Sequence, residues 1–222
     1  LSPDDSAEGY FAMPMEVMVR FGMWDEILAE ADNYPAAMIG TRALHHAARA
    51  IAYASKGDSK NARKEQAIFV EKTKLVPKDE ALGTNNVADL LAVAWHMSEG
   101  EIRIREGQFD AGIMELRRAI ELEDALHYDE PPGWLIPVRH SLGATLMRRG
   151  RYAEAEQLYR EDLARSPANG WSLYGLAESL SAQNKNAAET KVTKAKFQTI
   201  WANADTWIIS SCLCQPARMG SE

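Results

Sequence analysis

The chain has 222 residues, of which 46% are hydrophobic and 26% charged, a composition that builds packed cores and excludes a disordered protein. Its 32 acidic residues outnumber its 25 basic residues and give a net charge of −7, so we expect no nucleic-acid partner, because phosphates attract cations. No run approaches the roughly 18 apolar residues of a membrane-spanning helix, so we expect no membrane partner either.

The N-terminus begins at Leu1 and lacks the basic and apolar regions of a signal peptide. Because an initiator methionine is also absent, we interpret the chain as a processed or cut piece of a longer protein. We expect it to be soluble, and the sequence leaves both a cytoplasmic and an exported location open.

Apolar residues recur at three- and four-residue steps along almost the whole chain, which is the periodicity of amphipathic helices. The pattern predicts an all-α fold of ten helices in five pairs. In chain order, the predicted helices cover residues 12–21, 24–31, 38–56, 59–75, 84–106, 109–127, 135–149, 152–165, 169–183 and 187–204. The only short run typical of a strand lies near the C-terminus, at residues 207–209.

Four of the predicted turns within helix pairs carry a glycine, which ends one helix and is followed by an aromatic or small residue that opens the next. These turn glycines are Gly22, Gly57, Gly107 and Gly150. Five positions after each glycine stand Ile27, Ala62, Gly112 and Ala155. Small residues there allow two antiparallel helices to approach closely.

The last of these turns resembles the tetratricopeptide repeat (TPR) family, whose 34-residue unit is a helix pair. The residues at the family's spacing are Leu142, Gly143, Gly150, Tyr152, Ala155, Tyr159 and Pro167. The following unit keeps Trp171 and Gly175 but has Ala182 where the turn glycine belongs. The resemblance implies a right-handed α-solenoid of about five TPR-like helix pairs, closed by a C-terminal capping helix and a tail.

The spacing of the turn glycines indicates two insertions. Gly57, Gly107 and Gly150 are 50 and 43 residues apart, which exceeds the 34-residue unit. We place the extra residues around 75–87 and 127–134. The predicted organisation is an N-terminal tail at 1–11, a TPR-like domain at 12–205 and a C-terminal tail at 206–222. A segment at 128–139 also resembles the C-terminal part of longer bacterial TPR proteins.

In the TPR family the first helix of each pair lines a concave groove, so the resemblance implies a set of groove residues. Aligned with the family's groove positions are Glu16, Arg20, Met97, Glu101, Arg105, His140, Met147 and Arg148. A groove that carries both charge signs with methionines between them suits an amphipathic or extended peptide. The alternative interpretation is that these side chains only solvate a surface.

The connection between the sixth and seventh predicted helices gathers a second set of candidates. These pocket candidates are Asp124, Tyr128, Glu130, Trp134 and Arg139. Arg139 could pair with Glu130 or Asp124 and form a small pocket. The structural alternative is that Pro131 and Pro132 end one helix while Trp134 fills the gap before the next.

These observations predict a non-catalytic interaction module that binds a protein or peptide ligand in the concave groove. No catalytic signature stands out, so we expect neither enzymatic activity nor a cofactor. The competing interpretation is a small-molecule, metal or redox-linked role of the pocket candidates with His140, or of Cys212-x-Cys214. For the two cysteines we favour exposed thiols of an ordinary tail. Self-association is a third possibility.

Overall fold

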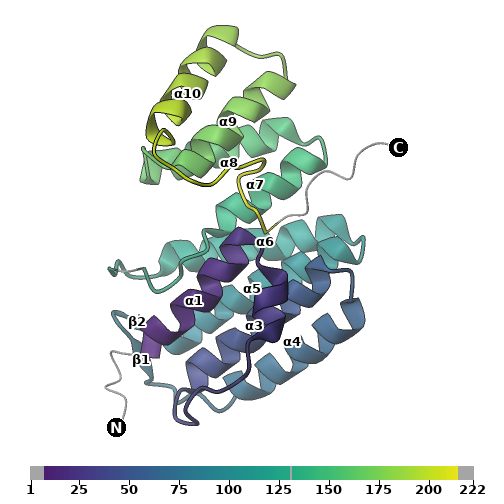
Figure 1. Ribbon diagram of the computed structural model, residues 1–222, viewed down its shortest axis with the longest axis vertical. Coiled ribbons are helices and arrows are strands. Elements are labelled where there is room, and N and C mark those ends of the chain that lie inside the picture. Colours follow the sequence, from purple (N-terminus) through teal and green to yellow (C-terminus); the bar gives the residue numbers. More distant parts are fainter. Residues whose placement is uncertain (1–7, 131, 215–222) are drawn as a thin grey trace. The chain divides into compact units, whose positions relative to one another are not determined.

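A computed structural model describes residues 8–130 and 132–214 of the chain (Figure 1). The all-α prediction is confirmed, and the described residues form ten helices. In chain order these are α1 (Glu8–Phe21), α2 (Trp24–Ala29), α3 (Ile39–Ser55), α4 (Ser59–Thr73), α5 (Val87–Arg105), α6 (Phe109–Ala125), α7 (Val138–Arg148), α8 (Tyr152–Arg165), α9 (Gly170–Ala182) and α10 (Ala187–Ile200). The chain divides into two compact units, Leu1–Val138 and Arg139–Glu222.

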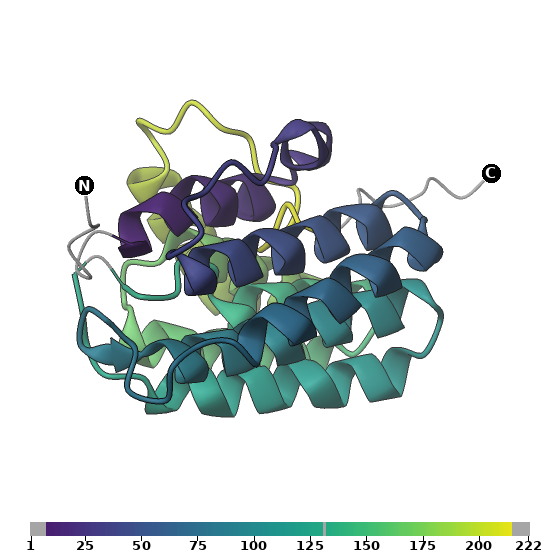
Figure 2. The same cartoon turned by 90° about the horizontal axis from the view of Figure 1, so that it is seen from below.

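The first unit consists of α-hairpins that pack beside one another. Helix α3 packs against α4 and α5 packs against α6, while α1 contacts α3 and α3 contacts α5 (Figure 2). A close approach between α5 and α6 joins Gly100 and Gly112. A Cβ atom on Gly112 would lie 2.8 Å from the Gly100 carbonyl oxygen. Glycine is therefore required at this seam, as the position five residues after the turn glycine predicts.

The turn glycines end their helices as predicted. Gly57, Gly107 and Gly150 have positive φ angles of 82°, 81° and 70°. The residue after each glycine donates its N–H to the carbonyl five residues earlier; Asp58, for example, donates to Tyr53 at 2.8 Å. This is the Schellman motif, in which a left-handed residue satisfies the last carbonyls of a helix.

The turn between α9 and α10 uses asparagine where the other turns use glycine. Ala182 is the last residue of α9, and the left-handed position is taken by Asn184 with φ of 51°. Lys185 then donates its N–H to the Leu180 carbonyl at 3.1 Å, in the same pattern as the other turns. Asparagine adopts this conformation more readily than other residues with a Cβ, so the repeat continues without its glycine.

The two predicted insertions of the first unit contact each other. The first contains a short hairpin, β1 (Ala81–Leu82) and β2 (Asn85–Asn86), which the periodicity does not predict. The buried Asn85 side chain accepts from the His127 N–H at 2.7 Å and donates to the His127 carbonyl at 3.0 Å. Helix α5 therefore begins at Val87, three residues later than predicted.

The second unit is organised around Tyr159 of α8. This fully buried side chain lies between Gly143 of α7 and Gly175 of α9. A Cβ atom on Gly143 would approach the ring to 2.5 Å and one on Gly175 to 2.3 Å, both too close for any real contact. The ring thus occupies the space that the two absent side chains leave, and it holds α7, α8 and α9 together.

None of the described helices has the length and apolar content that crossing a membrane requires.

The close contact of Tyr159 with Gly143 predicts how one added methyl group at position 143 changes the stability of the fold. We expect Gly143→Ala to lower the free energy of unfolding by about 1–3 kcal/mol, because the added Cβ overpacks the seam. At an unconstrained helix position the same change stabilises by up to about 1 kcal/mol. Urea unfolding followed by circular dichroism measures the difference.

A double-mutant cycle with Tyr159→Leu tests the cause. If the ring is the obstacle, Gly143→Ala costs much less in the Tyr159→Leu background. An equal cost in both backgrounds would contradict this account.

Candidate functional site

Half of the eight residues that the TPR resemblance places in the groove are buried in this structure. Met97 and Glu101 are 0% exposed, and His140 and Glu16 are also buried. Arg20, Arg105 and Met147 are half-buried, and Arg148 is exposed. Of this set, Arg148 is the residue most open to a ligand in the described conformation.

Two of the buried groove residues have charged or polar contacts within the first unit. The Glu101 carboxylate lies 3.6 Å from the Arg105 guanidinium, one helical turn away. The Glu16 carboxylate accepts the Leu135 N–H at 3.3 Å, and its other oxygen has no hydrogen-bond partner. Burial raises the pKa of Glu16 to about 8, so this group is mostly protonated at neutral pH.

The pocket candidates between α6 and α7 differ in their exposure. Tyr128 is 81% exposed and its hydroxyl donates to the Glu130 carboxylate on the surface. Trp134 is buried, and its indole N–H donates to the Ile136 carbonyl at 2.6 Å. Asp124 is half-buried, and Arg139 is the first residue of the second unit. The contacts of Trp134 match its structural interpretation, in which it fills a gap.

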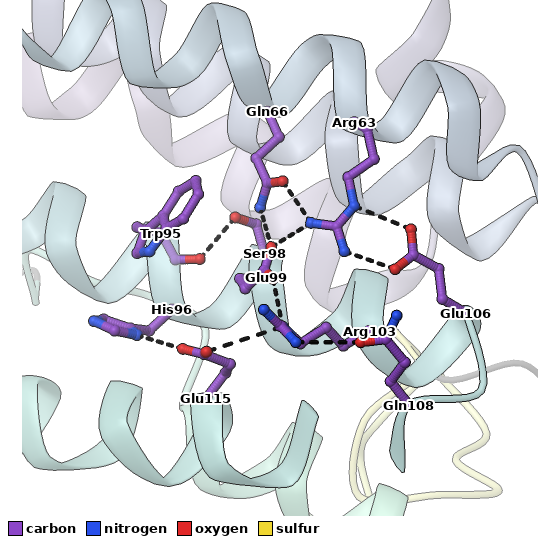
Figure 3. A network of polar contacts seen from close by, with 10 residues as sticks. All are labelled: Arg63, Gln66, Trp95, His96, Ser98, Glu99, Arg103, Glu106, Gln108 and Glu115. Atoms are coloured by element: carbon purple, nitrogen blue, oxygen red, sulfur yellow. Dashed lines mark hydrogen bonds and ion pairs between the residues drawn. The ribbon is translucent and has the colours of Figure 1, made fainter. Parts of the chain in front are cut away.

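A dense network of polar contacts links α4, α5 and α6 (Figure 3). The buried Glu99 carboxylate at its centre accepts hydrogen bonds from Gln66 at 2.7 Å, from Arg63 and from Arg103. Arg63 also forms a bidentate pair with Glu106, at 3.0 and 2.7 Å. Burial opposes ionisation of Glu99, but the hydrogen bonds from Gln66 and Arg63 outweigh it and lower the pKa of the carboxyl below its usual value. The network is internally satisfied, so we interpret it as a structural tie between helices.

The histidines and cysteines give no metal centre among the described residues, where no group of three or more possible ligands is gathered. Burial lowers the pKa of His45 to about 4 and keeps its imidazole neutral. Cys212 and Cys214 form a disulfide and both are buried. The expectation of exposed thiols is therefore wrong, and thiolates for a soft metal ion are not available in this state.

The disulfide belongs to a segment that returns onto the second unit after α10 (Figure 1). The chain turns at Trp201, whose indole N–H donates to the Thr206 carbonyl at 2.7 Å. Residues 207–214, which we name the C-terminal strap, then pass back to α7. Ser211 in the strap donates its hydroxyl hydrogen to the His140 carbonyl at 2.8 Å. Because that hydrogen is used, the Tyr159 hydroxyl must donate to the Ser211 oxygen, at 2.7 Å.

The position of Tyr159 defines the face on which the strap lies. Its ring starts on α8 and passes between Gly143 and Gly175, so its hydroxyl reaches the side of α7 and α9 that points away from α8. We name this side the inner face of the second unit. It is formed by α7 and α9.

The strap buries some of its residues and exposes others. Ser211, Cys212 and Cys214 are at most 3% exposed. Trp207 in contrast is 93% exposed and Ile209 61%. The strap is an irregular segment with bends at 209–211 and a turn at 213–214, and residues 207–209 do not pair with another strand.

A buried polar cluster joins the three helices α7, α8 and α9. The Asp162 carboxylate on α8 accepts the Ser172 hydroxyl of α9 at 2.6 Å and lies 3.3 Å from Nε2 of His140 on α7. Burial opposes ionisation of Asp162, but the hydrogen bonds and charge of its neighbours, His140 first, lower the pKa of the carboxyl below its usual value. The carboxylate stands between serine and histidine here, so the serine is not paired with a base as a nucleophile would be.

An open hollow of about 560 Å³ lies between the C-terminal half of α9 and α10. Three lysines line it, Lys185, Lys191 and Lys194. Two of them are paired with carboxylates, since Lys185 binds Glu156 at 2.9 Å and Lys194 lies 3.5 Å from Glu178. The positive charge is largely balanced, so we do not assign an anion site to this hollow.

Sequence reasoning missed the strap because helical periodicity says nothing about a segment without helices. One signal was present, since the tail carries apolar residues such as Ile208 and the Cys-x-Cys pair at a spacing that allows a local disulfide. Tyr159 was recognised as a repeat residue, but its hydroxyl carried no sequence signal for a second contact.

Comparison with protein-family models, with curated proteins and with solved structures gives no match for this chain.

The buried Glu16 predicts how stability depends on pH. Its pKa is about 8 in the folded protein and close to 4.5 when unfolded. Between these values the native state keeps a proton that the unfolded chain releases, so the free energy of unfolding falls as pH rises from about 5 to 8. Glu16→Gln keeps the acceptor for Leu135 and removes the titration, so we expect a flatter profile and a gain in stability at pH 8.

Urea unfolding at pH 5, 6.5 and 8 measures the effect, with the exposed Glu26→Gln as the control that leaves the profile unchanged. If Glu16→Gln follows the wild-type profile, the titration of Glu16 does not contribute.

Proposed function

We propose that this chain is a non-catalytic interaction module that binds an extended protein or peptide segment on the first helices of TPR-like pairs. In this proposal the pairs stack as a right-handed solenoid and their first helices form the concave side. The inner face of α7 and α9 is the part of that surface to which we assign the binding. No cofactor takes part.

The observation that carries the proposal is the seating of the strap. A segment without helix or strand lies on the inner face and is held through a main-chain carbonyl, that of His140, and through the hydroxyl of Tyr159. Contacts of this kind depend on a small hydroxyl side chain and little else of the guest, which suits recognition of an extended peptide. Arg148, which the TPR resemblance places in the groove, is the exposed member of that set and stands at the end of α7.

The alternatives have less support. A metal role of the cysteines conflicts with their pairing in a disulfide. A small-molecule pocket at the connection before α7 has no support from Tyr128, which is exposed, while Trp134 is buried and bonded to the Ile136 carbonyl. The redox alternative, by contrast, has a specific observation in its favour, because the disulfide sits in the segment that occupies the proposed site.

Removing one oxygen atom tests the proposed site. Tyr159→Phe keeps the ring between its two glycines and deletes the hydroxyl that faces the guest. We expect peptides selected from a displayed random library on the full chain, with and without reductant, to lose affinity about fivefold for this variant, as for one hydrogen bond. Fluorescence anisotropy measures the dissociation constants.

Arg148→Ala serves as a second probe of the same face, and Tyr53→Phe, in the first unit, is the matched control. The proposal fails if no peptide is selected, or if the selected peptides bind Tyr159→Phe and Arg148→Ala as tightly as the wild type.

A further inference from the structure

The strap occupies the surface to which the proposed function assigns a partner. Ser211 is 2% exposed, and its hydroxyl contacts the His140 carbonyl of α7 and the Tyr159 hydroxyl of α8. A partner that used the Tyr159 hydroxyl and the His140 carbonyl would therefore meet a site that is already filled.

We propose that the strap is a tethered ligand of the inner face, and that reduction of its disulfide by a dithiol releases it, so that the face then accepts an extended partner segment of the same chemistry. This inference rests on the proposed function and names both its regulation and its class of partner.

Because the strap is covalently joined to the second unit, a few contacts are enough to keep it on the inner face. A ligand joined by a short connection acts at an effective concentration on the order of millimolar, so two hydrogen bonds and a few buried side chains suffice to fill the site. A free peptide has to compete with that concentration. Occupation by the strap thus lowers the apparent affinity for a partner until the strap is weakened.

The disulfide is the element of the strap that chemistry can change. It closes a small ring between Cys212 and Cys214, which restricts the chain where it follows Ser211, and both cysteines are buried when the strap is seated. Opening the ring returns conformational freedom to the strap, so seating it again costs more entropy. Two separate thiol groups also occupy more volume than the bonded sulfur pair at this buried position.

The redox step is an ordinary thiol–disulfide exchange. One thiolate of the dithiol attacks a strap sulfur and forms a mixed disulfide, and the second thiol of the reductant then displaces it. The strap gains two electrons and two protons as two thiols, and the dithiol becomes a disulfide. Because the strap cysteines are at most 3% exposed, the reductant reaches them when the strap lifts, and reduction then favours the lifted state.

The chemistry of the strap describes the partner. It is a segment with a small hydroxyl residue at the position of Ser211, able to accept from Tyr159 and donate to the His140 carbonyl. An apolar residue three positions earlier corresponds to Ile208, which is 8% exposed. Side chains that correspond to Trp207 and Ile209 point away from the face and are not selected.

The test uses the full chain and a peptide probe that reductants cannot open. The probe is a fluorescein-labelled peptide with the sequence of residues 207–214, bridged by a thioether in place of the disulfide. Its dissociation constant is measured by anisotropy on the oxidised chain and on the chain reduced by dithiothreitol, with complete reduction verified by alkylation of two thiols. The double variant Cys212→Ser, Cys214→Ser supplies a strap that cannot close its ring.

We expect at least tenfold tighter binding of the probe to the reduced chain than to the oxidised chain. The double variant should bind as tightly as the reduced chain and should not respond to reductant. In the reduced state, Tyr159→Phe should weaken the probe about fivefold. Chymotryptic cleavage after Trp207 should become faster on reduction.

Equal affinity for the oxidised and reduced chains overturns the inference, and so does absence of binding in both states. These failures differ from a failure of the proposed function. If library-selected peptides depend on Tyr159 while the bridged probe ignores the redox state, the face binds partners but the strap does not control it. If the probe responds to redox state and no foreign peptide binds, the strap controls a face that serves no partner of this kind.

Discussion

Close approach between helices is the constraint on which the described structure depends. At two seams, Gly100 with Gly112 and Gly143 with Gly175, the space for a side chain is absent, and a neighbouring residue fills it. Apolar packing at such short distance supplies the stability that a helix pair cannot obtain alone. Each glycine lowers the stability of its own helix by roughly 1 kcal/mol relative to alanine. The closer packing between helices at the seams offsets this loss.

The same constraint produces the candidate site. Because α7 and α9 carry glycines at the seam, a tyrosine from α8 reaches completely between them, and its hydroxyl arrives at the opposite side. A buried tyrosine needs a partner for its oxygen, and Ser211 of the strap provides it. The packing core and the inner face are therefore connected through one side chain, whose ring packs in the first and whose hydroxyl lies at the second.

The sequence patterns predict the helices and their turns, but they do not predict which segments cover those helices or which of their residues are buried. The ten helices and the glycine turns could be predicted because they depend on local periodicity and on residues with a special φ angle. Asn184 replaced an expected glycine because asparagine also tolerates that angle. The hairpin at Asn85 and the strap at Ser211 could not be predicted, since each is held by contacts with residues about 40 to 70 positions away. For the same reason, the burial of Met97 and Glu101 did not follow from their place in a repeat.

The size of the disulfide ring argues that its effect is local. In the chain-entropy description, a crosslink stabilises a fold by shortening the loops of the unfolded chain, and the gain is smallest for the shortest loops. Cys212 and Cys214 are separated by two positions, so their bond constrains little of the unfolded chain. What it does constrain is the path of the strap immediately after Ser211, where the segment meets Tyr159. A bond that contributes little to global stability and fixes the shape of a bound segment acts on the site more than on the fold.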